Sequence, residues 1–483
     1  MNRTFLINIL FLVFVNLLVK PFYLFGIDRT VQNTLPAGDY GLFATLFGFS
    51  FLFQIINDFG IQGYNNRQIA QHNHLLTKYF PDLLALKGFL GLVYLLVVLL
   101  FGAALGYLQQ YPFLLLLLIV NHFLTSLALF LRSNVSGLAL YRTDSLLSVA
   151  DRFILILLLG LILLVPAWKA QLRVEYFVLA QTVSLLSSCL LALGALRPHI
   201  GALRIQLKTK LLLVILKQSY PYALVVFLMS MYTRLDSVMI ERLLEDGLLE
   251  VDRYASAYRL LDASNMIGFL FATLLLPMFS RILKAKEHPG ALAHFSARLL
   301  LAGAITLAIA VIYVRTPLMT ALYDDGNAYS GQILAWLMAS FVGVCGTYIY
   351  GTLLTAGGRL MPMNRLFAFS VLANVVLNIL LIPRWGALGA AVATCVTQWG
   401  AFLGQLWLAR RAFQLGDDWR TVLRLILLTS LLILLGESLQ QIFHLYWMVL
   451  LVALGVTGSI LSFLLRLINL QGIRELLSSK TTA

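Results

Sequence analysis

Apolar stretches long enough to cross a bilayer recur from one end of this chain to the other. A helix needs about 20 apolar residues to cross roughly 30 Å of hydrocarbon. Because 60% of the residues are hydrophobic and only 12% are charged, no segment is left with the composition of a soluble domain. The sequence therefore predicts an all-α polytopic membrane protein with about fourteen transmembrane helices. We expect these to start near Phe5, Asp39, Leu83, Pro112, Leu146, Val174, Ser219, Tyr254, Phe295, Gly331, Pro362, Gly386, Arg420 and Phe443.

The distribution of lysine and arginine predicts how these helices are oriented. Cytoplasmic loops are enriched in basic residues, and a cytoplasmic N-terminus places 22 of the 35 lysines and arginines in cytoplasmic segments and 7 on the other side. This asymmetry favours an even number of helices, with both termini in the cytoplasm. It also explains most of the net charge of +14, so we do not expect a nucleic-acid partner.

A faint internal duplication indicates how the helices are grouped. At a constant offset of 214 residues, Lys20 corresponds to Arg234, Tyr40 to Tyr254 and Arg67 to Arg281. Transporters are often built from two related bundles. We therefore expect an N-lobe of helices 1–6 at residues 1–213 and a C-lobe of helices 7–12 at residues 214–411. Helices 13 and 14 and a cytoplasmic tail follow at residues 412–483.

Four basic residues interrupt runs that are otherwise apolar: Lys20, Arg132, Arg234 and Arg259. A charge at the centre of a membrane helix costs roughly 2.5 to 3.5 kcal/mol on insertion scales. We expect these residues to line a hydrated cavity that receives an anion such as a diphosphate, because Arg binds phosphate oxygens bidentately and Lys acts as a point charge. The alternatives are that Lys20 extends to the interface and that the arginines form ion pairs between helices.

Acidic and amide side chains in the spans are candidates for other roles. Asp58, Asp236 and Asp262 could bind a coupling proton or sodium ion, because a desolvated carboxylate binds a cation reversibly. A cap or hinge at Asp58 and neutralisation of Arg259 by Asp262 are the structural alternatives. Asn374 and Asn378 lie four apart, so their amides share a helix face and could bind a sugar or bond another helix, of which the second is the default.

Two segments resemble the polysaccharide flippases of the Wzx type. The first is the opening run Leu35–Phe43 with Asp58-Phe59-Gly60 and Arg67, and the second is Ile382–Thr394 after Asn374 and Asn378. Arg234-Leu235-Asp236 and the segment Tyr254–Arg259 extend the resemblance over most of the chain. The motifs are moderately specific to the wider multidrug/oligosaccharidyl-lipid/polysaccharide (MOP) superfamily, which also contains lipid II flippases and multidrug antiporters.

The resemblance implies a two-lobe bundle in the bacterial inner membrane. It would move undecaprenyl-diphosphate-linked oligosaccharide from the cytoplasmic to the periplasmic leaflet by alternating access, for surface polysaccharide synthesis such as that of O-antigen. Lys20, Arg132 and Arg234 are the first candidates for diphosphate contact, and Arg259 and Arg67 the second. No cofactor or metal is expected beyond a coupling ion (H⁺ or Na⁺) or the membrane potential. Polysaccharide polymerase machinery is a candidate partner.

Three other functions remain open. A lipid II flippase is close in architecture, and nothing in the sequence excludes it. A drug or cation antiporter of the MATE type is disfavoured, because cations in the cavity do not suit a cationic substrate. A membrane glycan polymerase or ligase should carry a long outer loop, whereas the outer connections here reach only about 15 residues, so we do not expect an enzyme.

Overall fold

The computed structural model describes residues 15–16, 18–61, 75–138, 140–200, 209–443 and 446–468. Every regular element in these ranges is a helix, and none of their residues forms a strand. Twelve helices in this part of the chain are long and apolar enough to cross a bilayer, and Asp39–Leu52 is a shorter apolar helix. The all-α polytopic fold is therefore confirmed, and fourteen is an approximate count.

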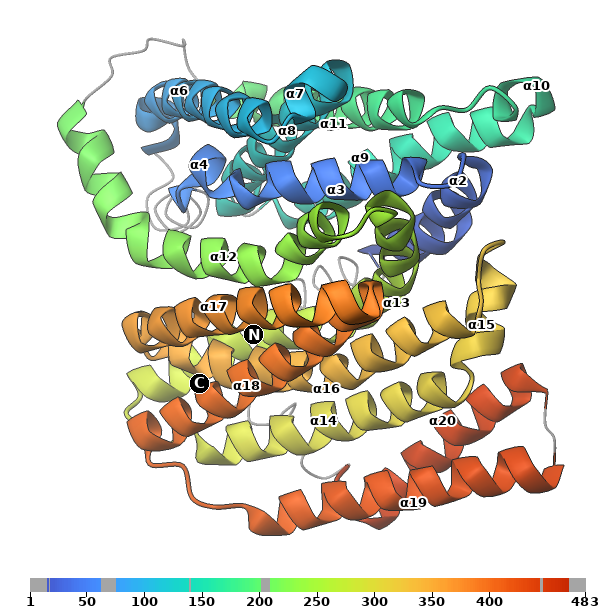
Figure 1. The fold of residues 1–483 in the computed structure, drawn as a ribbon. Coiled ribbons are helices and arrows are strands. Elements are labelled where there is room, and N and C mark those ends of the chain that lie inside the picture. Colours follow the sequence, from blue (N-terminus) through green and yellow to red (C-terminus); the bar gives the residue numbers. More distant parts are fainter. Residues whose placement is uncertain are drawn as a thin grey trace. The chain divides into compact units, whose positions relative to one another are not determined.

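The described helices form two compact units, residues 2–238 and residues 239–483 (Figure 1). The division falls within one long helix, α12 (Thr209–Leu243). The lobe boundaries at 213/214 and 411/412 were expected from the repeat, which the structure does not test, and they remain predictions.

In the first unit, α8 packs against α3, α6, α9 and α11. An apolar core that includes Phe80, Phe130 and Leu196 fills the space between α6, α8 and α11. The elements of this unit are η1 (Tyr23–Asp28), α2 (Arg29–Thr34), α3 (Asp39–Leu52), α4 (Gln54–Asp58), α6 (Leu75–Ala104), α7 (Tyr107–Gln110), α8 (Pro112–Gly137), α9 (Tyr141–Leu164), α10 (Pro166–Lys169), α11 (Val174–Leu196), η2 (Arg197–His199) and most of α12.

Two helices of this unit are irregular where polar residues occur. The first helix contains a π-helical turn, η1, and such turns are frequent at functional sites. The span expected to start at Asp39 is broken by a turn at Phe53 into α3 and α4. It ends at Phe59, which has a left-handed backbone with φ of 47°. This end sets the carboxylate of Asp58 at the terminus of α4.

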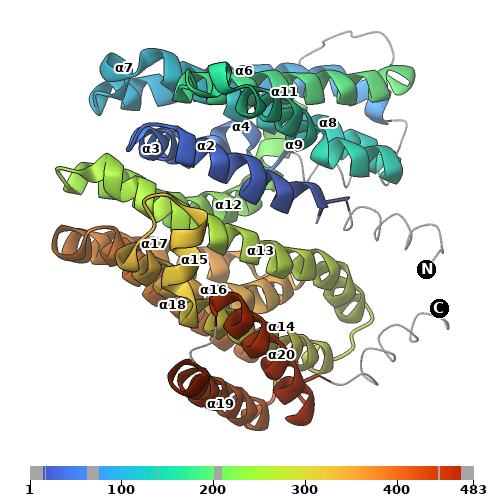
Figure 2. The same ribbon diagram turned by 90° about the vertical axis from the view of Figure 1, so that its right-hand side faces the viewer.

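In the second unit, α16 is the central helix, and it packs against α13, α14 and α18. The helices are α13 (Gly247–Lys284), α14 (Gly290–Tyr313), α15 (Arg315–Leu322), α16 (Ala328–Ala356), α17 (Leu360–Trp385), α18 (Ala387–Phe413), α19 (Trp419–Phe443) and α20 (Trp447–Leu464). The last two helices, α19 and α20, lie at the edge of this unit and pack on α14 (Figure 2). Their separation from the C-lobe, expected from the sequence, remains a prediction.

A one-residue turn at Gly386, within the Ile382–Thr394 run, joins α17 to α18. Gly386 adopts φ 61° and ψ −141°, a conformation that is essentially restricted to glycine. An added Cβ would lie 2.6 Å from both the Glu250 Oε2 atom and the Tyr329 hydroxyl. Glu250 Oε2 accepts hydrogen bonds from the Tyr329 hydroxyl at 2.6 Å and from the Ala387 amide at 2.9 Å. This part of the motif therefore fixes the ends of α13, α16 and α18.

Candidate functional site

The π-helical turn of the first helix holds a buried carboxylate. Asp28 is 6% exposed, and its two oxygens accept hydrogen bonds from the hydroxyls of Tyr23 at 3.4 Å and Tyr40 at 3.1 Å. The guanidinium of Arg152, on α9, lies 4.7 Å from the centre of the Tyr23 ring. Arg152 is also within electrostatic range of Asp28. Tyr23 therefore contacts both the Asp28 carboxylate and the Arg152 guanidinium.

Lys20 belongs to the same polar region. Its ammonium lies within electrostatic range of Asp151, Arg152 and Arg132. Lys20 is on the first helix, Arg132 on α8, and Asp151 and Arg152 on α9. The structure therefore brings together two of the cations predicted to contact a diphosphate, and it adds Arg152. We call Lys20, Arg132 and Arg152 the cation cluster.

Arg132 forms an ion pair within this cluster. Its Nε atom lies 2.9 Å from Asp144 Oδ1, and the two side chains are 23% and 17% exposed. The pair joins the end of α8 to the start of α9. It is an ion pair between helices, the alternative that the sequence left open for the arginines. It also leaves the guanidinium partly accessible, so a substrate anion could compete with Asp144 for it.

Arg234 lies in an aromatic environment of the same unit. Its guanidinium is 5.8 Å from the ring centre of Phe47 and 5.7 Å from that of Phe51, both on α3. The imidazole of His122 packs on the same two rings, at 4.8 and 5.6 Å. Cation–π contacts stabilise an arginine that has lost part of its hydration. Arg234 therefore packs on aromatic side chains of α3.

The most buried cation of the described residues is Lys87, on α6, which was not predicted from the sequence. It is 1% exposed, and its ammonium donates to the Asp58 carboxylate, to the Asn57 carbonyl at 3.1 Å and to the Ser126 hydroxyl at 2.8 Å. Three donors thus meet three acceptors, which is the full capacity of an ammonium group. Asp58, a candidate for ion coupling, is therefore the partner of a buried lysine.

The other two candidate carboxylates lie in different units. Asp236 is fully buried on α12 in the first unit. Asp262 is half-buried on α13 in the second unit, within electrostatic range of Tyr348. An ion-coupling role for either of them remains a prediction.

Arg259 is buried in the second unit, with 4% exposure. Its Nη1 donates a hydrogen bond of 2.9 Å to the Tyr323 hydroxyl, and its guanidinium lies 5.6 Å from the same ring centre. Arg259 therefore connects α13 to the segment that follows α15. Convergence of Arg259 with Lys20 and Arg234 across the two units remains a prediction, and Arg67 lies outside the described residues.

Asn374 and Asn378 contact each other on α17. The Nδ2 of Asn378 donates to Asn374 Oδ1 at 3.1 Å and also lies 3.7 Å from the sulfur of Met239. Both side chains are fully buried. The bonds link α17 to α12, which is the interhelical arrangement considered from the sequence, and a sugar contact remains a prediction.

Three polar residues of the first unit were missed from sequence: Lys87, Arg152 and Asp28. The signal for Lys87 was available, since it interrupts an apolar run as Lys20 does. Asp28 and Arg152 lie nearer to polar segments and could not be separated from interfacial residues. In the described residues, no group of three or more His, Cys, Asp or Glu side chains could hold a metal ion.

The arrangement of helices is similar to that of two solved membrane proteins. The lipid II flippase MurJ, in an inward closed conformation, superposes with a TM-score of 0.67 at 15% identity, covering 93% of this chain and 97% of that one. An inward-facing multidrug resistance MATE family transporter of the MOP superfamily superposes with a TM-score of 0.56 at 14% identity, covering 81% of this chain and 94% of that one. No curated protein matches the sequence.

The fold is thus that of the MOP-superfamily transporters, a class of multi-pass membrane proteins. A family model described as polysaccharide biosynthesis protein matches residues 5–283. The match spans more than half of the chain, so the protein belongs to the polysaccharide biosynthesis protein family. The resemblance inferred from the sequence motifs is confirmed at this level.

Proposed function

We propose that the protein is a flippase that moves a polyprenyl-diphosphate-linked oligosaccharide from the cytoplasmic to the periplasmic leaflet. The family and the fold support a transporter that serves polysaccharide synthesis. The observation that carries the proposal is the cation cluster, which places three basic side chains of three apolar helices in one region of the first unit. Such charges in membrane helices mark substrate pathways by default.

The cation cluster is suited to bind the diphosphate of the substrate. Arg132 and Arg152 supply planar forks of N–H donors, and Lys20 adds a mobile point charge. Without substrate, Asp144 and Asp151 balance these charges. Binding of a diphosphate would replace those carboxylates, so that substrate entry changes the contacts that join α8 to α9.

Movement of the substrate would follow the alternating access that two-lobe transporters use, in which one bundle rocks against the other. A protonatable group is needed if transport is coupled to a proton gradient. Asp28 adds a fourth candidate to Asp58, Asp236 and Asp262. Coupling by H⁺, Na⁺ or the membrane potential would each give a different dependence of transport on the imposed gradients.

Genetic complementation tests the proposed function. The gene is introduced into bacterial strains that each lack one defined flippase, for O-antigen, for another surface glycan or for lipid II. Recovery of surface glycan in a polysaccharide-flippase mutant, and its loss in an Arg132→Ala variant that reaches the membrane in normal amount, are the expected results. Full rescue by the Arg132→Ala variant would overturn the assignment to the cation cluster.

A lipid II flippase is the second candidate, favoured by the superposition on such a protein over 93% of this chain. Both substrates carry a polyprenyl diphosphate, so the same cation cluster would serve either. Rescue of the lipid II flippase mutant alone would select this second function. Rescue of no strain, together with drug resistance on expression, would favour the antiporter.

A further inference from the structure

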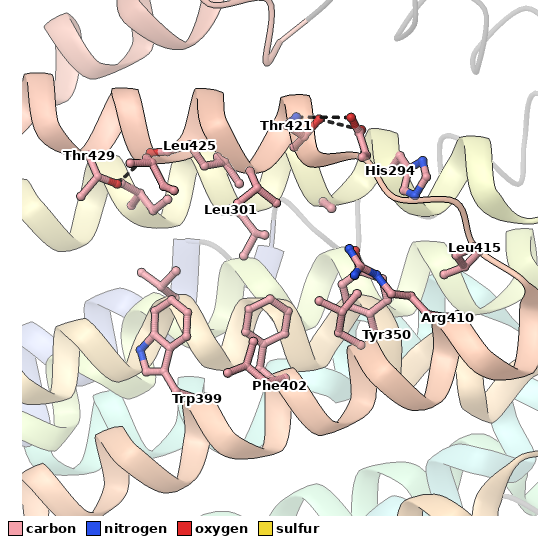
Figure 3. Close-up of a pocket in the computed structure, with 18 of the residues that line it drawn as sticks. His294, Leu301, Tyr350, Trp399, Phe402, Arg410, Leu415, Thr421, Leu425 and Thr429 are labelled. Carbon is pink, nitrogen blue, oxygen red and sulfur yellow. Dashed lines mark hydrogen bonds between the residues drawn. The ribbon is translucent and has the colours of Figure 1, made fainter.

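A cavity of about 380 Å³ lies within the second unit, between α19 and the bundle formed by α14, α16 and α18 (Figure 3). Its size is in the range of sites that bind small molecules. Helix α19 packs on α14, and the cavity lies between α19 and α18. It is distinct from the cation cluster, which belongs to the first unit.

The body of the cavity is apolar and aromatic. Trp399 and Phe402 of α18 point into it from one side, Leu301 of α14 and Leu425 of α19 from the other (Figure 3). The Trp399 indole N–H is already bonded to the Ala339 carbonyl at 3.0 Å, so the ring presents carbon atoms to the cavity. This part suits a hydrocarbon chain.

One end of the cavity is polar and charged. Asp418 there accepts bonds from Arg298 Nη2 at 2.7 Å and from the Thr421 hydroxyl at 2.6 Å. Arg410 lines the same end beside Tyr350, and His294 also lines it (Figure 3). Its partner is Asp417 at 3.0 Å, whose side chain is 79% exposed. An exposed ion pair of this kind contributes little, so Arg410 can exchange its partner at small cost.

The charge around this end is positive. Residues 410–424 contain four arginines and two aspartates, and Arg298 adds a fifth arginine. This end is where α14 begins, α18 ends and α19 begins, which the basic loops predict to be the cytoplasmic side. Basic pockets between membrane helices on the cytoplasmic side bind anionic lipid headgroups.

The length of the cavity matches one leaflet. Along α19 it extends from Thr421 to Ser430, which is about 14 Å at 1.5 Å per residue. That is about half of the roughly 30 Å hydrocarbon thickness. An acyl chain that starts at the interface has this reach, whereas a polyprenyl chain is much longer.

We propose that this cavity binds one anionic glycerophospholipid of the cytoplasmic leaflet. Its phosphate lies on Arg410, and one acyl chain lies between Trp399, Phe402 and α19. The lipid fills the space that separates α19 from α18 and thereby attaches the two C-terminal helices to the bundle. This site is independent of the proposed substrate and of its path.

Native mass spectrometry of the full-length protein tests the proposal. The delipidated protein is titrated with phosphatidylglycerol or with phosphatidylethanolamine of the same chains. We expect one phosphatidylglycerol to bind at least about tenfold more tightly than the other copies and than phosphatidylethanolamine. Equal binding of the two lipids, or displacement of the bound lipid by equimolar undecaprenyl phosphate, would overturn the proposal.

Two pairs of variants locate the site. Ser430→Trp fills the cavity, and Ser438→Trp makes the same change at an exposed position of α19 outside it. Arg410→Gln removes the headgroup contact, and Arg411→Gln removes the neighbouring arginine that stacks on Trp407. The first member of each pair should lose the tight lipid, and the second should keep it. Leu301→Phe, which also fills the cavity, replaces Ser430→Trp if that variant does not fold, and retention of the lipid in either cavity-filled variant contradicts the site.

Discussion

Arg132 and Asp144 form an ion pair of 2.9 Å between the end of α8 and the start of α9. The pair lies in the cation cluster with Lys20, within a membrane-spanning part of the chain. In the proposed mechanism Asp144 pairs with Arg132 in the absence of substrate, and the substrate's diphosphate replaces it when it binds. Substitution of Arg132 and substitution of Asp144 should therefore have opposite effects on substrate binding.

Arg132→Ala should weaken binding of undecaprenyl diphosphate by about tenfold or more, because a hydrogen bond to a charged group contributes about 1.5–3 kcal/mol. Asp144→Asn should strengthen it, because the competing carboxylate charge is removed. Arg142→Ala, at an exposed position on the same helix as Asp144, is the control and should bind as the wild type does. Binding is measured by native mass spectrometry of the purified protein, and weaker binding by Asp144→Asn would contradict the competition.

Asp58→Asn should destabilise the protein by about 3 kcal/mol, because it leaves the charge of Lys87 buried without its carboxylate. Lys87→Met alone should also destabilise it. The double variant should recover most of the loss, since both charges are then removed together. Thermal unfolding in detergent measures all three, and additive losses in the double variant would show that the pair is not coupled.

Gly386→Ala should lower stability by about 1–3 kcal/mol, because the backbone at this junction suits glycine alone and the new methyl group would meet Glu250 and Tyr329. The matched change is Gly400→Ala on α18, where no atom lies within 4 Å of the added Cβ. That variant should be as stable as the wild type or more so, by up to about 1 kcal/mol. Thermal unfolding compares the two, and equal melting temperatures would rule out strain at the junction.

The attachment of α19 should weaken in acid. Burial alone would raise the pKa of Asp418, but hydrogen bonds from Thr421 and Arg298 and the Arg298 charge bring it below its usual value. The stabilisation is therefore complete above about pH 4, the unfolded pKa of an aspartate, and it is lost as pH falls through the lower folded pKa. Asp418→Asn should be less stable than the wild type at pH 7, and the difference should shrink below pH 4. A constant difference from pH 7 to pH 3 in thermal unfolding would exclude this origin.

The helices could be predicted because hydrocarbon imposes a length and a composition on each of them. Expected starts at Asp39, Pro112 and Val174 coincide with the observed ones. The π-helical turn at Tyr23–Asp28 and the break at Phe53 were not predictable. Asp28 in the π-helical turn accepts a hydrogen bond from Tyr40 of α3, and apolar patterning does not encode such a contact.

The types of residue at the candidate site could be predicted from the sequence, but most of their ion-pair partners could not. Cations within apolar runs could be found from the sequence, and Lys20 and Arg132 share one region of the structure. The pairing of Asp58 with Lys87 could not be found, because the two residues lie 29 positions apart on different helices. Part of the Ile382–Thr394 motif, around Gly386, has a structural role where α17 meets α18.

Transport by the purified protein in liposomes tests the central claim most directly. A fluorescent polyprenyl-diphosphate oligosaccharide is placed in both leaflets, and its accessibility to an external reagent is followed with time. We predict that the wild type and Arg142→Ala equilibrate the substrate between leaflets, and that Arg132→Ala does so at least about tenfold more slowly. Equal rates for Arg132→Ala and the wild type would contradict recognition of the diphosphate by these cations.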